Sequence, residues 1–221
     1  LPHQVKRRLK IIHERGKQQL RLVEELITLA TFETGETIHN KKDVMFWDFI
    51  RKYSNEARFM ISSLVDKRYR TDNFVFEKEI DDALKGAIVS CDEERIRQVI
   101  DNLIENSIKY SSKDNIFVRM EVKVQDGNVL VRIEDRGIGI PDSEKEMVFK
   151  PFYQVRKGLH PVSDGMGKGL SIVKEHVESH GGRISFRSST GQGTIFEFTL
   201  PIKDVVSYQT RRNIMKILVV D

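Results

Sequence analysis

Glycine is distributed very unevenly along this chain of 221 residues. Four of the 14 glycines precede residue 137, and the other ten lie between Gly137 and Gly193. Glycine reaches backbone conformations and close contacts that other residues cannot. The cluster therefore indicates several turns or ligand-contacting segments, and we expect the functional site to lie there.

Composition limits the class of protein. The chain has 37 Lys and Arg against 33 Asp and Glu, and its net charge of +4 is too small for a dedicated nucleic-acid binder. Cys91 is the single cysteine, which excludes an internal disulfide and fits a reducing, cytoplasmic compartment. No apolar run approaches the roughly 20 residues of a membrane-spanning helix. We therefore expect this segment to be soluble, to bind no nucleic acid and to make no membrane contact.

The length corresponds to about one and a half domains at roughly 150 residues per domain. Residues 1–36 carry a 4,3 alternation of apolar and small side chains that is typical of a bundle helix. A helix with such a stripe needs a partner helix. At the other end, a polar linker over residues 203–214 leads to an apolar run over residues 215–221. The chain thus looks like a segment of a longer protein, which can itself carry a membrane anchor.

Residues 40–202 predict a domain of the α+β class, with helices packed on a mixed, mostly antiparallel sheet. Helices are expected over residues 44–65, 92–110 and 168–180. Strands are expected over residues 73–80, 87–90, 118–124, 129–134, 184–187 and 194–200. Turn signals at Asp126-Gly127 and between residues 190 and 193 join four of these strands into two hairpins.

Residues 92–110 predict a helix with two different faces. Asp92 is a good N-cap, and at about 100° per residue the apolar residues share one arc, the expected core face. Asn102, Asn106 and Lys109 form a polar stripe beside that arc. The stripe is either a solvated helix edge or a ligand site, in which an amide oxygen binds Mg²⁺ and the lysine offsets phosphate charge.

Asp135 stands where a predicted strand ends, and Gly137, Gly139 and Ile140 follow it. A carboxylate at a strand end can accept a hydrogen bond from the amino group of a base, and the glycines allow the backbone to approach that base. The same pattern also occurs in an ordinary tight turn.

A second glycine pattern opens the last predicted helix. Gly165, Gly167, Lys168, Gly169 and Leu170 follow one another at its start, so that backbone N–H groups and the helix dipole can face a phosphate. The spacing is neither that of a P-loop nor that of a dinucleotide-binding turn. An ordinary glycine-rich turn is the alternative.

Five motifs occur in a characteristic order: Asn-x3-Asn-x2-Lys-Tyr, Asp-x-Gly-x-Gly-Ile-Pro, Phe-x-Pro-Phe-Tyr, Gly-x-Gly-x-Gly-Leu and Gly-x-Gly-Thr. In this order they resemble the catalytic and ATP-binding domain of sensor histidine kinases, which belong to the Bergerat-fold ATPases. The resemblance covers roughly residues 40–202. It implies a Bergerat-type α/β sandwich, preceded by a long helix that resembles the second helix of a dimerisation and histidine-phosphotransfer hairpin.

The resemblance implies a set of ATP-binding positions. Asn106 is the expected magnesium ligand, Asp135 is expected to bind the adenine amino group, and residues 154–168 are expected to cover the nucleotide. Phe149 and Phe152 complete an aromatic motif with Tyr153, and Ser107 stands where the family usually has alanine. The full set of expected binding residues is Asn102, Asn106, Lys109, Tyr110, Asp135, Gly137, Gly139, Ile140, Tyr153, Gly165, Gly167, Lys168, Gly169, Leu170 and Thr194.

The resemblance also implies a reaction and partners. Asn102 stands where gyrase-like ATPases have a glutamate base, and an amide cannot take a proton, so transfer of the γ-phosphoryl group is favoured over hydrolysis. The phospho-accepting histidine is expected upstream of Leu1 and is not His13. Expected partners are a second copy, bound through the helical bundle, and a response-regulator receiver domain. Residues 215–221 resemble the first strand of such a receiver domain.

Two alternatives remain open. The same fold occurs in serine kinases that act as anti-sigma factors, although the bundle helix argues against that class. A nucleotide-sensing module without catalysis would carry the same motifs.

Overall fold

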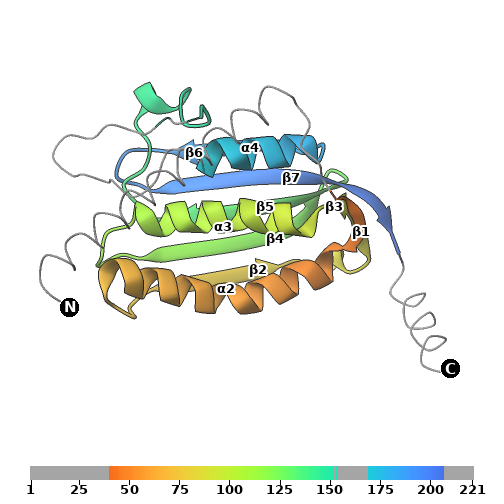
Figure 1. The fold of residues 1–221 in the computed structure, drawn as a ribbon, viewed down its shortest axis with the longest axis horizontal. Helices are drawn as coiled ribbons and strands as arrows, with labels where there is room; N and C mark the ends of the chain where they lie inside the picture. The colour runs from red at the N-terminus through yellow and green to blue at the C-terminus, as the bar shows by residue number, and fades with distance from the viewer. Residues whose placement is uncertain (1–39, 152, 154–168, 207–221) are drawn as a thin grey trace, which may run out of the picture. The chain divides into compact units, whose positions relative to one another are not determined.

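The computed structural model describes residues 40–151, 153 and 169–206 (Figure 1). The predicted bundle helix, His13, Phe152, the expected covering segment 154–168 and the predicted receiver strand 215–221 lie outside the described residues. None of the described helices is long and apolar enough to cross a membrane.

Within the described residues, three helices cover one face of a seven-stranded sheet, as Figure 1 shows. The helices are α2 (Phe46–Tyr69), α3 (Glu93–Lys109) and α4 (Gly169–Ser179). The strands are β1 (Lys42–Met45), β2 (Val75–Ile80), β3 (Ala87–Cys91), β4 (Phe117–Gln125), β5 (Asn128–Asp135), β6 (Ile184–Ser188) and β7 (Thr194–Val205). This confirms the α+β class.

The strand order is β1-β3-β7-β5-β4-β2, and β6 pairs with the first part of β7. Among the described strands, every pairing is antiparallel except the one between β2 and β4. The expected mixed, mostly antiparallel sheet and both predicted hairpins are therefore present.

The start and the buried face of helix α3 are explained by local sequence features. The Asp92 side chain accepts hydrogen bonds from Glu94 N at 3.1 Å and Arg95 N at 3.2 Å, which caps the helix. The expected core face is buried, and it consists of Ile96, Val99, Ile100, Leu103, Ile104, Ser107 and Ile108. Burying one such aliphatic side chain stabilises the fold by about 1.5–3 kcal/mol, so this face anchors α3 to the sheet.

Two predicted boundaries were wrong because pairing at a distance decides them. Strand β7 continues past Pro201 to Val205, so residues 203–205 belong to the sheet and not to a linker. At Pro201 the strand makes its last pairing with β5, and beyond it pairs with β3, so the missing N–H of proline interrupts no continuous ladder. The helix predicted over residues 44–65 begins at Phe46 instead, because Val44 and Met45 belong to strand β1. Strand β1 was not predicted, because a strand of four residues has no recognisable alternation.

The face of the sheet opposite the helices carries alternating charges. Arg132 lies between the buried Val131 and Ile133 of β5, so its side chain points to that other face. Its guanidinium contacts Glu121 on β4 and lies 2.6 Å from Glu197 on β7. Because Arg132 is only 26% exposed and joins three strands, this network is stronger than an isolated surface ion pair.

We predict that Arg132→Met, which keeps the apolar stem but removes the charge, lowers the free energy of unfolding by about 1–2 kcal/mol. The two carboxylates would then face each other without the cation between them. Urea unfolding at low and at high salt measures the loss, which should shrink in high salt.

A matched control is Lys145→Met, because the Asp142 partner of Lys145 is 94% exposed. This variant should change the free energy of unfolding by less than about 0.5 kcal/mol. Equal losses for the two variants would contradict a stabilising role of the network.

Candidate functional site

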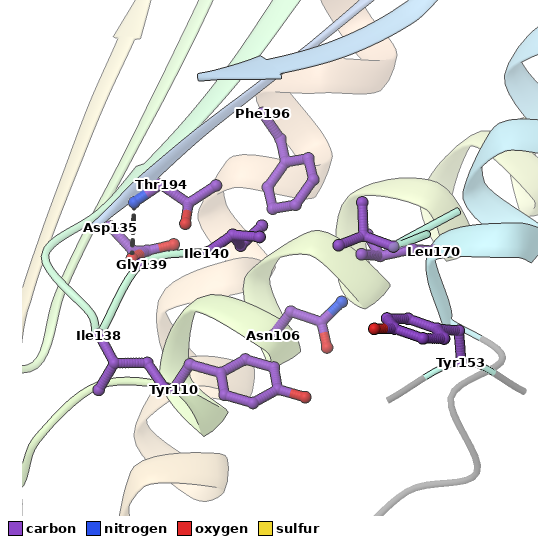
Figure 2. A pocket seen from close by; sticks show the side chains of 11 residues that line it. Asn106, Tyr110, Asp135, Ile138, Gly139, Ile140, Tyr153, Leu170, Thr194 and Phe196 are labelled. Atoms are coloured by element: carbon purple, nitrogen blue, oxygen red, sulfur yellow. Dashed lines mark hydrogen bonds between the residues drawn. The ribbon is translucent and has the colours of Figure 1, made fainter. Parts of the chain in front are cut away.

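A pocket opens between α3, the start of α4, the end of β5 and the start of β7 (Figure 2). It holds about 630 Å³ of space, including its open mouth. Its lining is largely apolar with a few polar groups, as is usual for a small-molecule site. The lining residues are Asn106, Tyr110, Asp135, Ile138, Gly139, Ile140, Val148, Tyr153, Leu170, Thr194 and Phe196.

Asp135 is the buried acid of this pocket and is only 6% exposed. Its Oδ1 accepts hydrogen bonds from Gly137 N at 2.8 Å and from Thr194 N at 3.1 Å, the second of which Figure 2 shows as a dashed line. Burial raises the pKa of Asp135 to about 6, although these two N–H donors and the Ser107 hydroxyl favour the ionised form. The carboxylate thus joins the end of β5 to the start of β7.

Two glycines near Asp135 are required by the fold itself. Gly139 and Gly193 have φ values of +69° and +83°, which strain any other residue. A Cβ atom at Gly139 would overlap the carbonyl of Ser189, and one at Gly193 would overlap the carbonyl of Asp135. The sequence left two interpretations of the Asp-x-Gly-x-Gly pattern, a tight turn or a ligand-contacting segment. The two are compatible, because this tight turn also forms part of the pocket wall.

Helix α3 supplies the opposite wall. Figure 2 shows the Asn106 carboxamide and the Tyr110 ring facing the pocket. Lys109 does not line it, but its ammonium lies 5.3 Å from the centre of the Tyr110 ring. Asn102 does not line it either, because its Nδ2 donates to the Gln98 carbonyl oxygen at 2.9 Å, one turn back along the helix. Asn102 instead lies beside Gly169, the first residue of α4.

The structure brings most of the expected binding residues together. Eight of them line the pocket: Asn106, Tyr110, Asp135, Gly139, Ile140, Tyr153, Leu170 and Thr194. Gly137 and Gly169 lie next to lining residues. Gly165, Gly167 and Lys168 lie outside the described residues.

The sequence motifs missed three lining residues, Ile138, Val148 and Phe196. Ile138 lies inside the predicted Asp-x-Gly-x-Gly turn, and Phe196 is an inward residue of a predicted strand. All three are apolar residues of kinds that are common in protein cores, so their type does not indicate a ligand site. Phe149, from the expected aromatic motif, packs on Phe186 with ring centres 5.7 Å apart and does not line the pocket. Phe186 in turn packs on the lining residue Phe196 with ring centres 5.6 Å apart, so Phe149 reaches the pocket wall through one intervening ring.

One side chain of the pocket suits a magnesium ion. Mg²⁺ prefers oxygen ligands, keeps several waters and takes few protein ligands when it arrives with phosphates, so the amide oxygen of Asn106 can serve as one donor. Across residues 40–151, 153 and 169–206, no group of three His, Cys, Asp or Glu side chains could hold a metal ion. Among the described residues, Asn106 is therefore the candidate donor for an ion that takes few protein ligands.

The sheet order, the three helices on one face and the pocket beside α3 define a Bergerat-type α/β sandwich, which is a nucleotide-binding fold. The family of histidine kinase-, DNA gyrase B- and HSP90-like ATPases matches residues 91–204, which is more than half of the chain. The chain belongs to this family.

Similar proteins include sensor kinases. The sensor histidine kinase WalK of Bacillus subtilis (strain 168) is 33% identical over 199 residues, which cover 89% of this chain and 30% of that protein. The sensor protein kinase WalK of Staphylococcus aureus (strain MRSA252) is 34% identical over 197 residues, covering 87% of this chain and 30% of that protein. The chain thus spans about 30% of the length of these curated relatives.

Solved structures share the fold. Full-length ShkA in complex with AMPPNP has a TM-score of 0.73 at 21% identity, over 94% of this chain and 41% of that chain. The catalytic domain of histidine kinase ThkA has a TM-score of 0.58 at 25% identity, over 74% of this chain and 96% of that chain. The expected Bergerat-type sandwich is therefore confirmed.

We predict that the raised pKa of Asp135 makes stability depend on pH. The folded chain holds this proton more tightly than the unfolded chain, whose aspartate has a pKa of about 4. The stabilisation from Asp135 is therefore fully present below pH about 4 and is lost as the pH rises through about 6. Asp135→Asn cannot titrate at this position. Between pH 4 and pH 7 the free energy of unfolding of the wild type should therefore fall by roughly 2–3 kcal/mol more than that of Asp135→Asn.

Urea unfolding of both proteins at a series of pH values measures this difference. Asp114→Asn is a matched control, because it removes the same charge from an exposed loop position. If Asp135→Asn follows the wild-type curve with a constant offset from pH 4 to 7, the buried carboxyl does not titrate as argued.

Proposed function

We propose that this chain is the ATP-binding part of a sensor histidine kinase of a two-component system. It binds Mg²⁺-ATP in the pocket of Figure 2 and passes the γ-phosphoryl group to a histidine outside the chain. The observation that carries the proposal is the arrangement of two different polar ends in one pocket. Asp135 lies at the sheet end, and Asn106 lies on the helix side.

The sheet end suits adenine. Both backbone donors to Asp135 reach the same atom, Oδ1, so Oδ2 keeps acceptor capacity for an amino group of a base. The flat apolar surroundings include Ile140 and Phe196, which can contact a purine ring. ShkA, which shares this fold, was solved with the nucleotide AMPPNP.

The helix side suits phosphates and their metal ion. Asn106 offers an amide oxygen to Mg²⁺, Lys109 adds positive charge next to Tyr110, and the N-terminal end of α4 favours negative charge. When bound, the magnesium ion would neutralise charge on the phosphates. The residues of this chain would then act by positioning the triphosphate, which is the main contribution of a protein to phosphoryl transfer.

Asn102 supports transfer over hydrolysis. Its side chain is an amide whose nitrogen is already bound to the Gln98 carbonyl, so it cannot activate a water molecule as a base. The full protein is proposed to dimerise through its helical bundle and to act on a response-regulator receiver domain, as expected of sensor kinases. The expected acceptor histidine upstream of Leu1 and the expected receiver strand over residues 215–221 remain part of this proposal.

We predict that Asn106→Ala lowers the Mg²⁺-dependent affinity for ATP by more than about ten-fold, because the single protein ligand to the metal is lost. Calorimetric titration with and without Mg²⁺ separates this loss from binding of the base. Asn55→Ala, at an exposed position of α2, is the control and should bind like the wild type. An unchanged affinity of Asn106→Ala would refute the assignment of the metal ligand.

We also predict that this chain alone does not label itself with acid-labile phosphate from ATP, because the acceptor histidine is expected upstream of Leu1. An added intact helical hairpin from a related sensor kinase should become labelled. Labelling of His13 would show that the acceptor was misplaced. Acid-stable phosphoserine on a partner would indicate a serine kinase, and ATP binding without any transfer would indicate a sensing module.

A further inference from the structure

Helices α3 and α4 run antiparallel, and polar contacts join them at the end far from the pocket. The N–H of Asp92, the N-cap of α3, donates to Nε2 of His180 at 3.0 Å. Nδ1 of His180 lies 2.6 Å from the His176 carbonyl oxygen. His180 therefore uses its two nitrogens as one acceptor and one donor, which is the neutral imidazole with its proton on Nδ1. This contact holds the C-terminal end of α4 against the start of α3.

A second contact lies nearer the pocket. Nε2 of His176 on α4 is 3.2 Å from Oε1 of Gln98 on α3. His176 is buried at 4% exposure, between the buried Val173 and Val177 of the same helix. Apolar packing of α4 on its neighbours does not by itself fix the rotation of α4 about its axis, whereas a hydrogen bond between side chains is directional.

Gln98 also contacts a residue of the expected phosphate side. Its backbone carbonyl oxygen accepts the hydrogen bond from Asn102 Nδ2 at 2.9 Å. With its nitrogen held in this way, Asn102 presents Oδ1 toward the start of α4, where a Cβ atom on Gly169 would lie only 3.1 Å from it. Gln98 is therefore in contact with α4 through its side chain and with Asn102 through its backbone.

At the pocket end, α4 has no side-chain anchor of its own in its first residue. Gly169 lacks a side chain, and the next residue, Leu170, lines the pocket opposite Asn106. The placement of this first turn therefore depends also on contacts further along α4. One of these contacts joins His176 to the polar side chain of Gln98 on α3, seven residues or about two turns beyond Gly169.

We propose that His176 and Gln98 are positioning residues for the triphosphate part of a nucleoside triphosphate. Their contact sets the rotation of α4, so that its N-terminal turn and Leu170 keep their place opposite Asn102 and Asn106. This inference rests on the proposed function, because it concerns binding of ATP in the same pocket. The adenine end at Asp135 belongs to the sheet and does not depend on this contact.

The test compares the full chain with His176→Leu, Gln98→Met and the double variant. Calorimetry gives the affinities for Mg²⁺-ATP and for adenosine, and urea unfolding confirms that each variant is folded. Each single variant should weaken Mg²⁺-ATP binding about five-fold and leave adenosine binding unchanged. The double variant should bind no more weakly than either single variant, because both remove the same contact.

Two further variants separate positioning from packing. His176→Gln keeps an N–H donor toward Gln98 and should retain most of the ATP affinity. Lys174→Met, on the exposed face of α4, should have no effect. If His176→Leu does not remain folded, Gln98→Met, at a half-buried position, carries the test.

The outcomes distinguish this inference from the proposed function. Equal losses for ATP and adenosine, additive losses in the double variant, or a change in stability without a change in ATP affinity would overturn the positioning role while leaving ATP binding intact. A wild-type chain that binds neither Mg²⁺-ATP nor adenosine would overturn the proposed function itself, and the positioning role with it.

Discussion

The hydrogen bonds to Oδ1 of Asp135 hold together the parts of the chain that form the pocket. One donor is Gly137 N, in the loop that follows β5, and the other is Thr194 N, at the start of β7, 59 residues beyond Asp135. A buried carboxylate without donors would be strongly unfavourable, so the loop must adopt the turn that presents its N–H groups. This arrangement also requires glycine at positions 139 and 193, where a Cβ atom would overlap neighbouring carbonyl groups.

The pocket combines two kinds of support. Its sheet end consists of paired strands and a glycine turn, so it is held by backbone hydrogen bonds of many residues. Its helix side depends on how α4 lies against α3, and there the contacts are few and made by particular side chains. We therefore expect the sheet end, which is proposed to bind the base, to be the more rigid part. At the end proposed to bind the phosphates, we expect single substitutions far from the ligand to change affinity.

Helix α3 and the first hairpin could be predicted closely from the sequence, because their causes are local. Asp92 caps α3, the apolar period decides which face is buried, and Asp126-Gly127 supplies the turn between β4 and β5. The extension of β7 beyond Pro201 could not be predicted, because it depends on pairing with β3, more than 100 residues earlier in the chain. The same holds for β1, which is defined by its pairing with β3.

The ordered motifs by themselves determined the family, the α+β class and eight of the residues that line the pocket, because each motif is a short segment with a local chemical reason. Tertiary structure decided which asparagine of α3 faces the pocket. Asn102 and Asn106 differ by only about 40° on the helical wheel. The position of α4 places Asn102 beside Gly169 and leaves Asn106 in the pocket. Tertiary structure also decided the burial of Asp135, which raises its pKa, because this burial arises only when the end of β5 meets the start of β7.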